Sequence, residues 1–436
     1  MDKELTFKEI KQYQAAYRNT ENKVKERASS KSGVRVASYN AAVSNQINRT
    51  FSIEVPTDNV TDQKQSGRCW LFAGLNVLRH QFAKKYHVKN FTFSQNHLFF
   101  WDRLERANIF LNHIIDTADK PLDDRYVQSY LSSPVSDGGQ WHMAISLIRK
   151  YGLLPSYAHE ESFSANNTAT FNGYLNNKMR ENALVLRKLV AAGDKAAAMA
   201  KKEEFLAEVY RMVAIAFGEP ADQFVLEYQD DDGKYHNDGQ MSPQDFFKNY
   251  FEDDLDDYVV LFNAPDHEYD KLYGLPFEDN VENGSPVRFL NTKIEVLKDA
   301  AIKQLQAGET IWFGCDVGKE SDRQAGILAT DLYATDELFG INTKLNKEER
   351  LLTRASGSTH AMTLVGVDLV DGQPTKWKIE NSWGTKVGDK GYFVMTDKWF
   401  DEYLFKVVVK KQYLPESLVK ISEGDATDVA PWDSMA

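Results

Sequence analysis

The chain has 436 residues, of which 42% are hydrophobic and 27% charged, and this composition is typical of a soluble globular protein with room for two or three domain-sized cores. Its 64 acidic and 52 basic residues give a net charge of −12, which argues against a general nucleic-acid binder. No apolar run approaches the about 20 residues that a membrane-spanning helix needs, and the N-terminus lacks the pattern of a secretory signal. The only two cysteines, Cys69 and Cys315, are too few for a disulfide scaffold, so we expect a cytoplasmic protein.

The first 56 residues are polar and mixed in charge. The sequence predicts a helix over about residues 5–17, followed by an irregular stretch rich in Ser and Asn. Such an arm rarely folds alone, so we expect it to wrap around its own domain or a neighbouring subunit.

The stretch from Gln63 to Leu78 organises the rest of the chain. Polar residues lead to Cys69, and the apolar run that follows predicts a buried helix to about residue 86. A cysteine in the first turn of a helix gains from unpaired N–H groups and from the helix dipole, which favour a thiolate. Either Ser66 or Gly67 is expected to start this helix. The alternative is that Cys69 is only a small buried hydrophobic residue, as most free cysteines are.

Two further helices are expected in the first half of the chain. One runs over about residues 94–117 with Ser94 as its N-cap, and the other runs over residues 141–151 and ends at Gly152. The sequence Asp-Gly-Gly-Gln at 137–140 predicts a turn between them.

The middle of the chain changes composition near residue 160. Residues 174–217 are rich in Ala, Lys, Glu and Leu and predict two helices that are broken near Gly193. Acidic clusters follow at 230–232 and 252–254. Neither cluster has the alternating oxygen ligands and central glycine of a calcium loop, so we interpret both as solvated surface and expect no metal.

A mixed pattern of helices and strands begins at about residue 287. Cys315 lies inside the apolar strand pattern Ile-Trp-Phe-Gly-Cys-Asp-Val, which favours a structural role for it. The sequence predicts helices over 293–307 and 397–403 and strands over 310–316, 360–370, 375–381, 391–395 and 405–410.

Two motifs in this last region bear on the role of Cys69. His360 opens a β-rich run in Gly-Ser-Thr-His-Ala-Met, and Asn381 is followed by Ser, Trp and Gly. A thiol needs a base to become a good nucleophile, and the base needs a third group that fixes its tautomer and ring orientation. A histidine at the start of a strand is, alone, more often structural. Cys69, His360 and Asn381 together supply the three roles.

The motifs Q-K-Q-S-G-R-C-W, S-T-H-A-M and E-N-S-W-G resemble those of papain-like cysteine peptidases, and specifically the bleomycin hydrolase and aminopeptidase C branch. This resemblance covers most of the chain. It implies an α+β, papain-like fold of two lobes, one helical and one β-barrel-like, with an N-terminal arm and a helical insertion. The segments expected are an arm at 1–56, a helical lobe at 57–160, a mainly helical insertion at 161–285, a β-rich lobe at 286–415 and a tail at 416–436.

The resemblance also implies how each residue acts. Cys69 would be a thiolate nucleophile whose pKa is lowered by His360 and the helix terminus. His360 would hold the proton and return it to the leaving amine. Asn381 would hydrogen-bond the far imidazole nitrogen, and Trp383 would shield that pair from water. The implied reaction is acyl transfer through a thioester, with no cofactor and no metal, and the absence of H-E-x-x-H disfavours a zinc peptidase.

The same resemblance assigns residues around the substrate. Gln63 and the backbone N–H of Cys69 would hold the tetrahedral oxyanion, whereas the neighbouring Gln65 receives no catalytic role. Gly138 and Gly139 would let a peptide lie along bare backbone.

Two departures from papain itself stand out. Papain-like enzymes usually carry a disulfide-bonded cysteine three residues before the nucleophile, and Ser66 occupies that position here, which suits a cytoplasmic enzyme. Cys69 and His360 lie 291 positions apart, instead of the about 130–150 expected in papain relatives. The insertion accounts for the excess.

In this branch six subunits form a ring, and the C-terminal carboxylate, here that of Ala436, meets the free α-amine of a peptide substrate, which gives an aminopeptidase. The ending Ala-Pro-Trp-Asp-Ser-Met-Ala at 430–436 resembles that of the branch, but Ser434 stands where proline is usual and the tail is about three residues shorter. A retracted carboxylate would favour an endopeptidase, so this alternative stays open. Nucleic-acid binding through lysines of the insertion is disfavoured by adjacent acidic residues.

Overall fold

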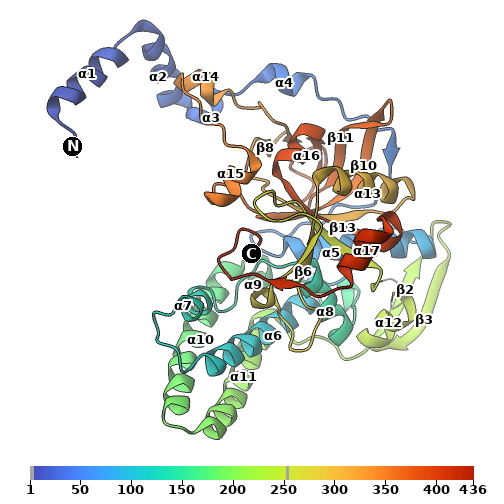
Figure 1. The fold of residues 1–436 in the computed structure, drawn as a ribbon. Coiled ribbons are helices and arrows are strands. Elements are labelled where there is room, and N and C mark those ends of the chain that lie inside the picture. The colour runs from blue at the N-terminus through green and yellow to red at the C-terminus, as the bar shows by residue number, and fades with distance from the viewer. Residues whose placement is uncertain (1–3, 252–254) are drawn as a thin grey trace.

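The computed structural model describes residues 4–251 and 255–436. It contains a mainly helical half and a half built on one large sheet, with the C-terminus between them and the N-terminal helices extending away from both (Figure 1). No helix in the described ranges is long and apolar enough to cross a bilayer.

The N-terminal arm is helical throughout most of its length. The predicted helix is confirmed as α1 (Phe7–Tyr17), but the irregular stretch predicted after it is wrong, because α2 (Thr20–Ser32), α3 (Val34–Ala37) and α4 (Ala41–Asn45) lie there. Local capping explains the difference, since the side chain of Asn19 accepts the backbone N–H of Asn22 at the start of α2. None of these four helices has a buried residue.

Helix α5 (Cys69–Tyr86) is the central helix of the molecule and is buried around most of its circumference. It packs against helices of one half and against strands of the other, and the indole N–H of Trp312 donates to the carbonyl of Trp70 at 3.1 Å. The helix begins where the apolar run predicted it. The expected N-cap is wrong, because Arg68 occupies that position without a side-chain cap. Ser66 instead bonds the carbonyl of Gln63 at 2.6 Å.

The helical half contains α6 (Gln95–Asp116), α7 (Arg125–Ser132) and α8 (Trp141–Tyr151). Ser94 caps α6 as predicted by accepting the N–H of His97, and α8 ends at Gly152 as predicted. Gly152 has a φ of +71°, and a β-carbon there would lie 2.1 Å from the backbone of Pro243. Only glycine fits this helix end.

The middle segment adds α9 (Phe163–Asn166) and two long helices, α10 (Thr168–Ala191) and α11 (Lys195–Phe217), which pack on α6. The predicted break lies at Gly193, whose φ is +82°. A hairpin of β2 (Phe224–Gln229) and β3 (Tyr235–Met241) leads to α12 (Pro243–Tyr250). Asp230 accepts backbone N–H groups of its own turn and pairs with His236. The cluster predicted at 252–254 lies outside the described residues.

The large sheet has the strand order β14-β5-β6-β4-β13-β7-β10-β11-β12-β9-β8, and β1 pairs with β10. Each strand predicted after residue 300 is present within two residues of its expected bounds. The sheet also includes strands from 258–274, in the last part of the stretch expected to be an insertion. The strands are β1 (Ile53–Glu54), β4 (Tyr258–Phe262), β5 (Lys271–Gly274), β6 (Arg288–Asn291), β7 (Ile311–Cys315), β8 (Ser321–Asp322), β9 (Ile327–Leu328), β10 (His360–Val370), β11 (Gln373–Glu380), β12 (Tyr392–Thr396), β13 (Leu404–Lys410) and β14 (Thr427–Asp428).

Short helices cover and connect these strands. They are α13 (Ile294–Gln306), α14 (Thr335–Phe339), α15 (Lys347–Leu352), α16 (Asp397–Tyr403) and α17 (Glu416–Ser422), with 3₁₀ turns at Ser156–Ala158, Pro276–Glu278 and Lys411–Tyr413. One hydrophobic cluster fills the helical half and the face of α5, and a second fills the sheet. The first residue of α5 therefore lies where the two halves meet.

Candidate active site

Cys69 is the first residue of α5, and its thiol is free. The backbone N–H of Ala361 on β10 hydrogen-bonds the sulfur. Because Ala361 directly follows His360, the packing of α5 on β10 brings the thiol and the histidine predicted from the sequence to one place. Cys315, on β7, pairs in register with His360 and is fully buried in the sheet core, as its strand pattern indicated.

The imidazole of His360 is oriented by Asn381. Its Nε2 lies 3.0 Å from Oδ1 of Asn381, which also accepts the backbone N–H of Ser382 at 2.8 Å. Since an amide oxygen only accepts hydrogen bonds, Nε2 carries the proton and Nδ1 keeps a free lone pair. Asn381 is fully buried, and the ring of Trp383 lies 4.8 Å from the His360 ring at 34°. This arrangement excludes water from the histidine–asparagine bond.

Burial sets the protonation of the pair. It raises the pKa of the Cys69 thiol and lowers the pKa of His360 to about 4. The lowered thiol pKa expected from the sequence is therefore wrong for the resting site, because removal from water disfavours each charge more than the helix terminus favours the thiolate. At neutral pH the resting imidazole is therefore uncharged, with its one proton on Nε2, and Nδ1 can act as a base.

Gln63 lies beside the start of α5 and is almost fully buried. Its Oε1 accepts the hydroxyl of Ser382 at 2.6 Å, and its Nε2 donates to the carbonyl of Ser66 at 2.6 Å. The side-chain amide has two N–H groups, so one donor remains for a ligand near Cys69. Gln65, by contrast, is exposed.

Gly138 and Gly139 lie beside Trp70, and a different structural feature accounts for glycine at each position. A β-carbon on Gly139 would lie 2.6 Å from the Trp70 ring, so glycine is needed for packing there. Gly138 has no neighbour within 4 Å of its missing β-carbon and is exposed, which suits the approach of an extended peptide. Its carbonyl accepts the guanidinium of Arg106.

Asp137 holds this loop to the nucleophile helix, and sequence reasoning missed its role. Its carboxylate accepts the backbone N–H of Gly67 at 3.1 Å, the amide of Asn172 at 2.5 Å and the guanidinium of Arg103 at 3.2 Å. Burial opposes this charge, but Arg103 and these hydrogen bonds keep the pKa of Asp137 below its usual value. The signal available in the sequence was an acidic residue next to the glycine pair.

A second buried charge cluster supports Asn381 from behind, and it too was missed. Glu380, the residue before Asn381, lies 2.6 Å from Arg79 and 3.2 Å from His80, both on α5. Burial opposes the charge of Glu380, but His80 and Arg79 hold its pKa below its usual value. The cluster fixes α5, which begins at Cys69, to the end of β11 (Gln373–Glu380), directly before Asn381.

The C-terminal tail is attached to both halves of the molecule. The ring of Trp432 lies under the guanidinium of Arg125 at 3.8 Å and beside Tyr126 at 4.8 Å, both on α7. The carbonyl of Trp432 accepts Arg354 at 2.6 Å. Met435 is 1% exposed and belongs to the first hydrophobic cluster. The tail therefore ends between the two halves (Figure 1).

Polar contacts continue to the last residues of the tail. Nε2 of His267 lies 3.1 Å from Asp433 and its Nδ1 lies 3.1 Å from Asp266, while the hydroxyl of Ser434 donates to Asp266 at 2.6 Å. Hydrogen bonds to Asp266 and Asp433 raise the pKa of His267 to about 9. Within the described part of the chain, no basic side chain pairs with the carboxylate of Ala436.

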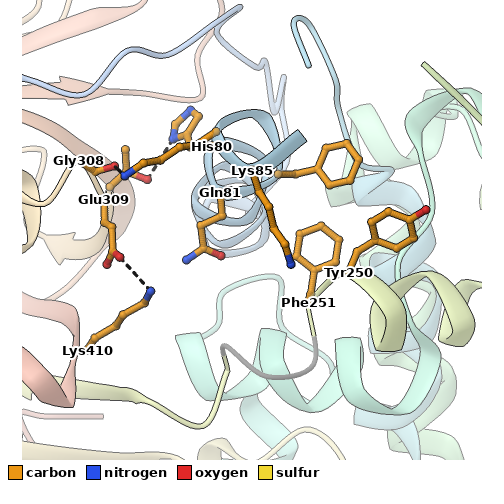
Figure 2. Close-up of a pocket in the computed structure, with 11 residues that line it drawn as sticks. His80, Gln81, Lys85, Tyr250, Phe251, Gly308, Glu309 and Lys410 are labelled. Atoms are coloured by element: carbon orange, nitrogen blue, oxygen red, sulfur yellow. Dashed lines mark hydrogen bonds and ion pairs between the residues drawn. The ribbon is translucent and has the colours of Figure 1, made fainter. Parts of the chain in front are cut away.

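A cavity of about 370 Å³ lies away from these residues, along the last turns of α5. Figure 2 shows Glu309 and Lys410 on one side of it, Tyr250 and Phe251 on the other, and Gln81 between them. Glu309 and Lys410 pair at 3.1 Å, so this cavity holds no free acid–base pair. The described residues also contain no group of three or more His, Cys, Asp or Glu side chains that could hold a metal.

The comparisons with known proteins agree with this geometry. Residues 4–436 match the Peptidase C1-like family. The chain belongs to that family. Aminopeptidase G of Lactobacillus delbrueckii subsp. lactis is 53% identical, and Aminopeptidase E of Lactobacillus helveticus is 52% identical, each over 100% of both chains. The crystal structure of PepW from Lactobacillus rhamnosis HN001 is 46% identical, covers 100% of this chain and 99% of its own, and has a TM-score of 0.98.

Family membership carries the fold and the class of enzyme. The two halves are the lobes of a papain-like α+β fold, as the motif resemblance implied, and the protein is a cysteine-type aminopeptidase of this family. The structure brings Gln63 and Cys69 together with His360 and Asn381, which lie about 300 positions further along the chain.

Proposed function

We propose that Cys69 is the nucleophile and that His360 is its general base. The thiol proton passes to the free Nδ1 of His360 as the sulfur attacks the carbonyl carbon of the peptide bond. The resulting imidazolium then gives the proton to the leaving amine, and a thioester remains on Cys69. A water molecule, deprotonated by His360, hydrolyses the thioester and releases the acid. The 3.0 Å bond from His360 to Asn381 supports this assignment, because it leaves Nδ1 as the only basic ring atom.

The remaining N–H of Gln63 and the backbone N–H of Cys69 would stabilise the tetrahedral oxyanion. Cys69 begins α5, and hydrogen bonds to Ser66 and Ser382 hold the side chain of Gln63 beside it. Both donors are therefore in place before charge develops on the substrate oxygen. Gly138 supplies the open backbone along which the substrate lies. Trp383 keeps water from the bond between His360 and Asn381.

We further propose that the carboxylate of Ala436 binds the α-ammonium of the substrate and so restricts cleavage to the first peptide bonds. The observation that supports this role is a tail seated between the lobes whose carboxylate lacks a basic partner among the described side chains. The α-ammonium of a peptide would form an ion pair with this carboxylate. An acetylated N-terminus carries no positive charge and cannot form that pair. The natural substrates proposed are therefore peptides with a free N-terminus.

The test is hydrolysis of one fluorogenic peptide in two forms, with its α-amine free or acetylated. Wild-type protein should cleave the free form and leave the acetylated form nearly intact, and Cys69→Ala should cleave neither. Equal hydrolysis of both forms would favour the endopeptidase alternative.

The assembly and location remain proposals as well. The arm exposes apolar residues, including Leu5 (61%), Phe7 (84%) and Tyr13 (60%), and such residues gain from burial against another subunit. This supports a homohexamer with the arm as a contact, and light scattering of the full chain and of a chain lacking residues 1–32 tests it. The two free thiols support a cytoplasmic location.

A further inference from the structure

The last residues of the tail are held by a compact cluster of charges outside the catalytic site. His267 lies in the loop after β4, between Asp266 on that same loop and Asp433 on the tail. Asp266 also accepts the hydroxyl of Ser434. Two carboxylates thus share one histidine, and each side of the cluster is completed by a residue of the tail.

The cluster fixes the tail within three residues of its end. Asp433 accepts the backbone N–H of Met435 at 2.9 Å, and the N–H of Ala436 donates to the carbonyl of Asp433 at 3.3 Å. The position of Asp433 therefore determines where the turn Asp433–Ala436 lies, and with it the terminal carboxylate.

We propose that His267 and Asp266 form a latch that positions the tail, and that this latch makes the enzyme selective for substrates with a free α-amine. The inference rests on the proposed role of the Ala436 carboxylate. Trp432 anchors the tail further back, on α7, and the latch contacts Asp433 and Ser434, the two residues that precede the buried Met435. His267 is a positioning residue, because it acts on the substrate only through the tail.

The charge of the latch explains why it needs the histidine. Without the imidazolium, Asp266 and Asp433 would face each other as two carboxylates, and like charges at such distances repel. The other titratable group packed on the ring is Tyr273 of β5, at 5.3 Å and edge-on. The raised pKa of His267 fits an imidazolium that is stabilised from both sides.

Ser434 adds a contact that is specific to this sequence. A proline at that position has no hydroxyl to donate, so the 2.6 Å bond to Asp266 would be lost. The serine thus gives the tail a second contact with the latch, directly before the buried Met435.

The experiment compares His267→Gln, Asp433→Asn and Ser434→Ala with His236→Gln. His236 is a matched control, because it pairs with Asp230 at 2.8 Å in the β2–β3 hairpin, away from the tail. For each variant, the ratio of hydrolysis of the acetylated peptide to that of the free peptide is measured. We expect this ratio to rise about ten-fold or more in His267→Gln and Asp433→Asn, which corresponds to about 1.4 kcal/mol. Ser434→Ala should give about two- to ten-fold, the worth of one hydrogen bond.

A second readout follows the tail itself. Each variant is combined with Cys69→Ala, and mass spectrometry measures how fast an added carboxypeptidase removes Ala436 and Met435. Removal should be about ten-fold faster in His267→Gln and Asp433→Asn and unchanged in His236→Gln. Equal removal from all four proteins would overturn the latch. Asp433→Asn and Ser434→Ala change only the tail, so these two variants still test the latch if His267→Gln does not fold.

The two readouts separate the latch from the proposed function. A wild-type enzyme that prefers the free amine, with the same ratio in every variant, would overturn the latch and leave the proposed function intact. A wild-type enzyme that cleaves both peptides equally would contradict the role of Ala436 and overturn the effect of the latch on selectivity, while faster trimming of His267→Gln would still support the positioning of the tail by the latch.

Discussion

The catalytic residues and the C-terminal tail are held in place by different means. Cys69 begins α5, His360 begins β10, and Asn381 directly follows β11. These three elements are packed into the hydrophobic clusters, and the buried ion pair of Glu380 and Arg79 joins β11 to α5. The residues from Trp432 onward are held by the contact of Arg125 with the Trp432 ring, a hydrogen bond from Arg354, the buried Met435 and a partly exposed charge cluster. The proposed chemistry is thus built into the core, whereas the proposed selectivity depends on a short segment that few contacts attach.

The largest expected effect separates the two cysteines. Cys69→Ala should lower the hydrolysis rate by roughly 10⁴-fold, because the nucleophile is removed. Cys315→Ala removes a buried thiol from the sheet and should lower the melting temperature but keep Cys69 reactive. Loss of activity in both proteins at full folding would contradict the structural role of Cys315.

The next effect concerns the buried ion cluster. Arg79→Ala removes the arginine partner of the buried Glu380 and leaves only His80 of the two partners described, which should cost about 3–5 kcal/mol in the free energy of unfolding. Lys410→Ala breaks the more exposed pair with Glu309 and should cost less than about 1 kcal/mol. Denaturant titration of both variants measures this difference. Similar losses in the free energy of unfolding would mean that the Glu380 cluster does not hold the two lobes together.

Two neighbouring glutamines give a third comparison. Gln63→Ala removes a proposed oxyanion donor and should lower kcat by about 10²- to 10³-fold. Gln65→Ala changes an exposed side chain and should leave kcat unaltered. Steady-state kinetics of both variants measures this difference in kcat. A Gln63→Ala variant with a raised KM and an unchanged kcat would argue against the oxyanion role.

The pH dependence of kcat/KM tests the protonation state of His360. With its pKa lowered to about 4, His360 is unprotonated above that pH and can take the proton of Cys69. We therefore expect kcat/KM to be constant toward acid and to fall only as the pH drops through about 4. A fall already centred near pH 6.5 would contradict the effect of burial on this histidine.

The smallest effect concerns the pH dependence of the latch. Because the pKa of His267 is raised to about 9, above the about 6.5 of a free histidine, its stabilisation of the tail is complete below about 6.5. It is lost as the pH rises through about 9. Carboxypeptidase trimming, expressed relative to His267→Gln, should therefore accelerate between pH 7 and 10, and a constant relative rate would contradict the imidazolium.

The helix and strands that carry or adjoin Cys69, His360 and Asn381 could be predicted from the sequence far better than the polar contacts that hold these elements together. The apolar run after Cys69 and the alternating strands near His360 and Asn381 gave those elements their bounds, because their periodicity reflects burial directly. The helices after Tyr17 were missed, since their polar composition carries no such period and local caps form them. His267, Asp137 and the Glu380 cluster act through contacts between distant segments, which no local pattern encodes.

The most direct test of the account is a chain that ends at Trp432, so that Asp433 and Ser434, which the latch holds, are removed together with the carboxylate of Ala436. We predict that a thiol-directed epoxysuccinyl reagent still labels Cys69 and that the truncated enzyme cleaves free and acetylated peptides at similar rates. A truncated, folded enzyme that keeps the wild-type preference for the free amine would contradict the account. It would place selectivity in the core rather than in the tail.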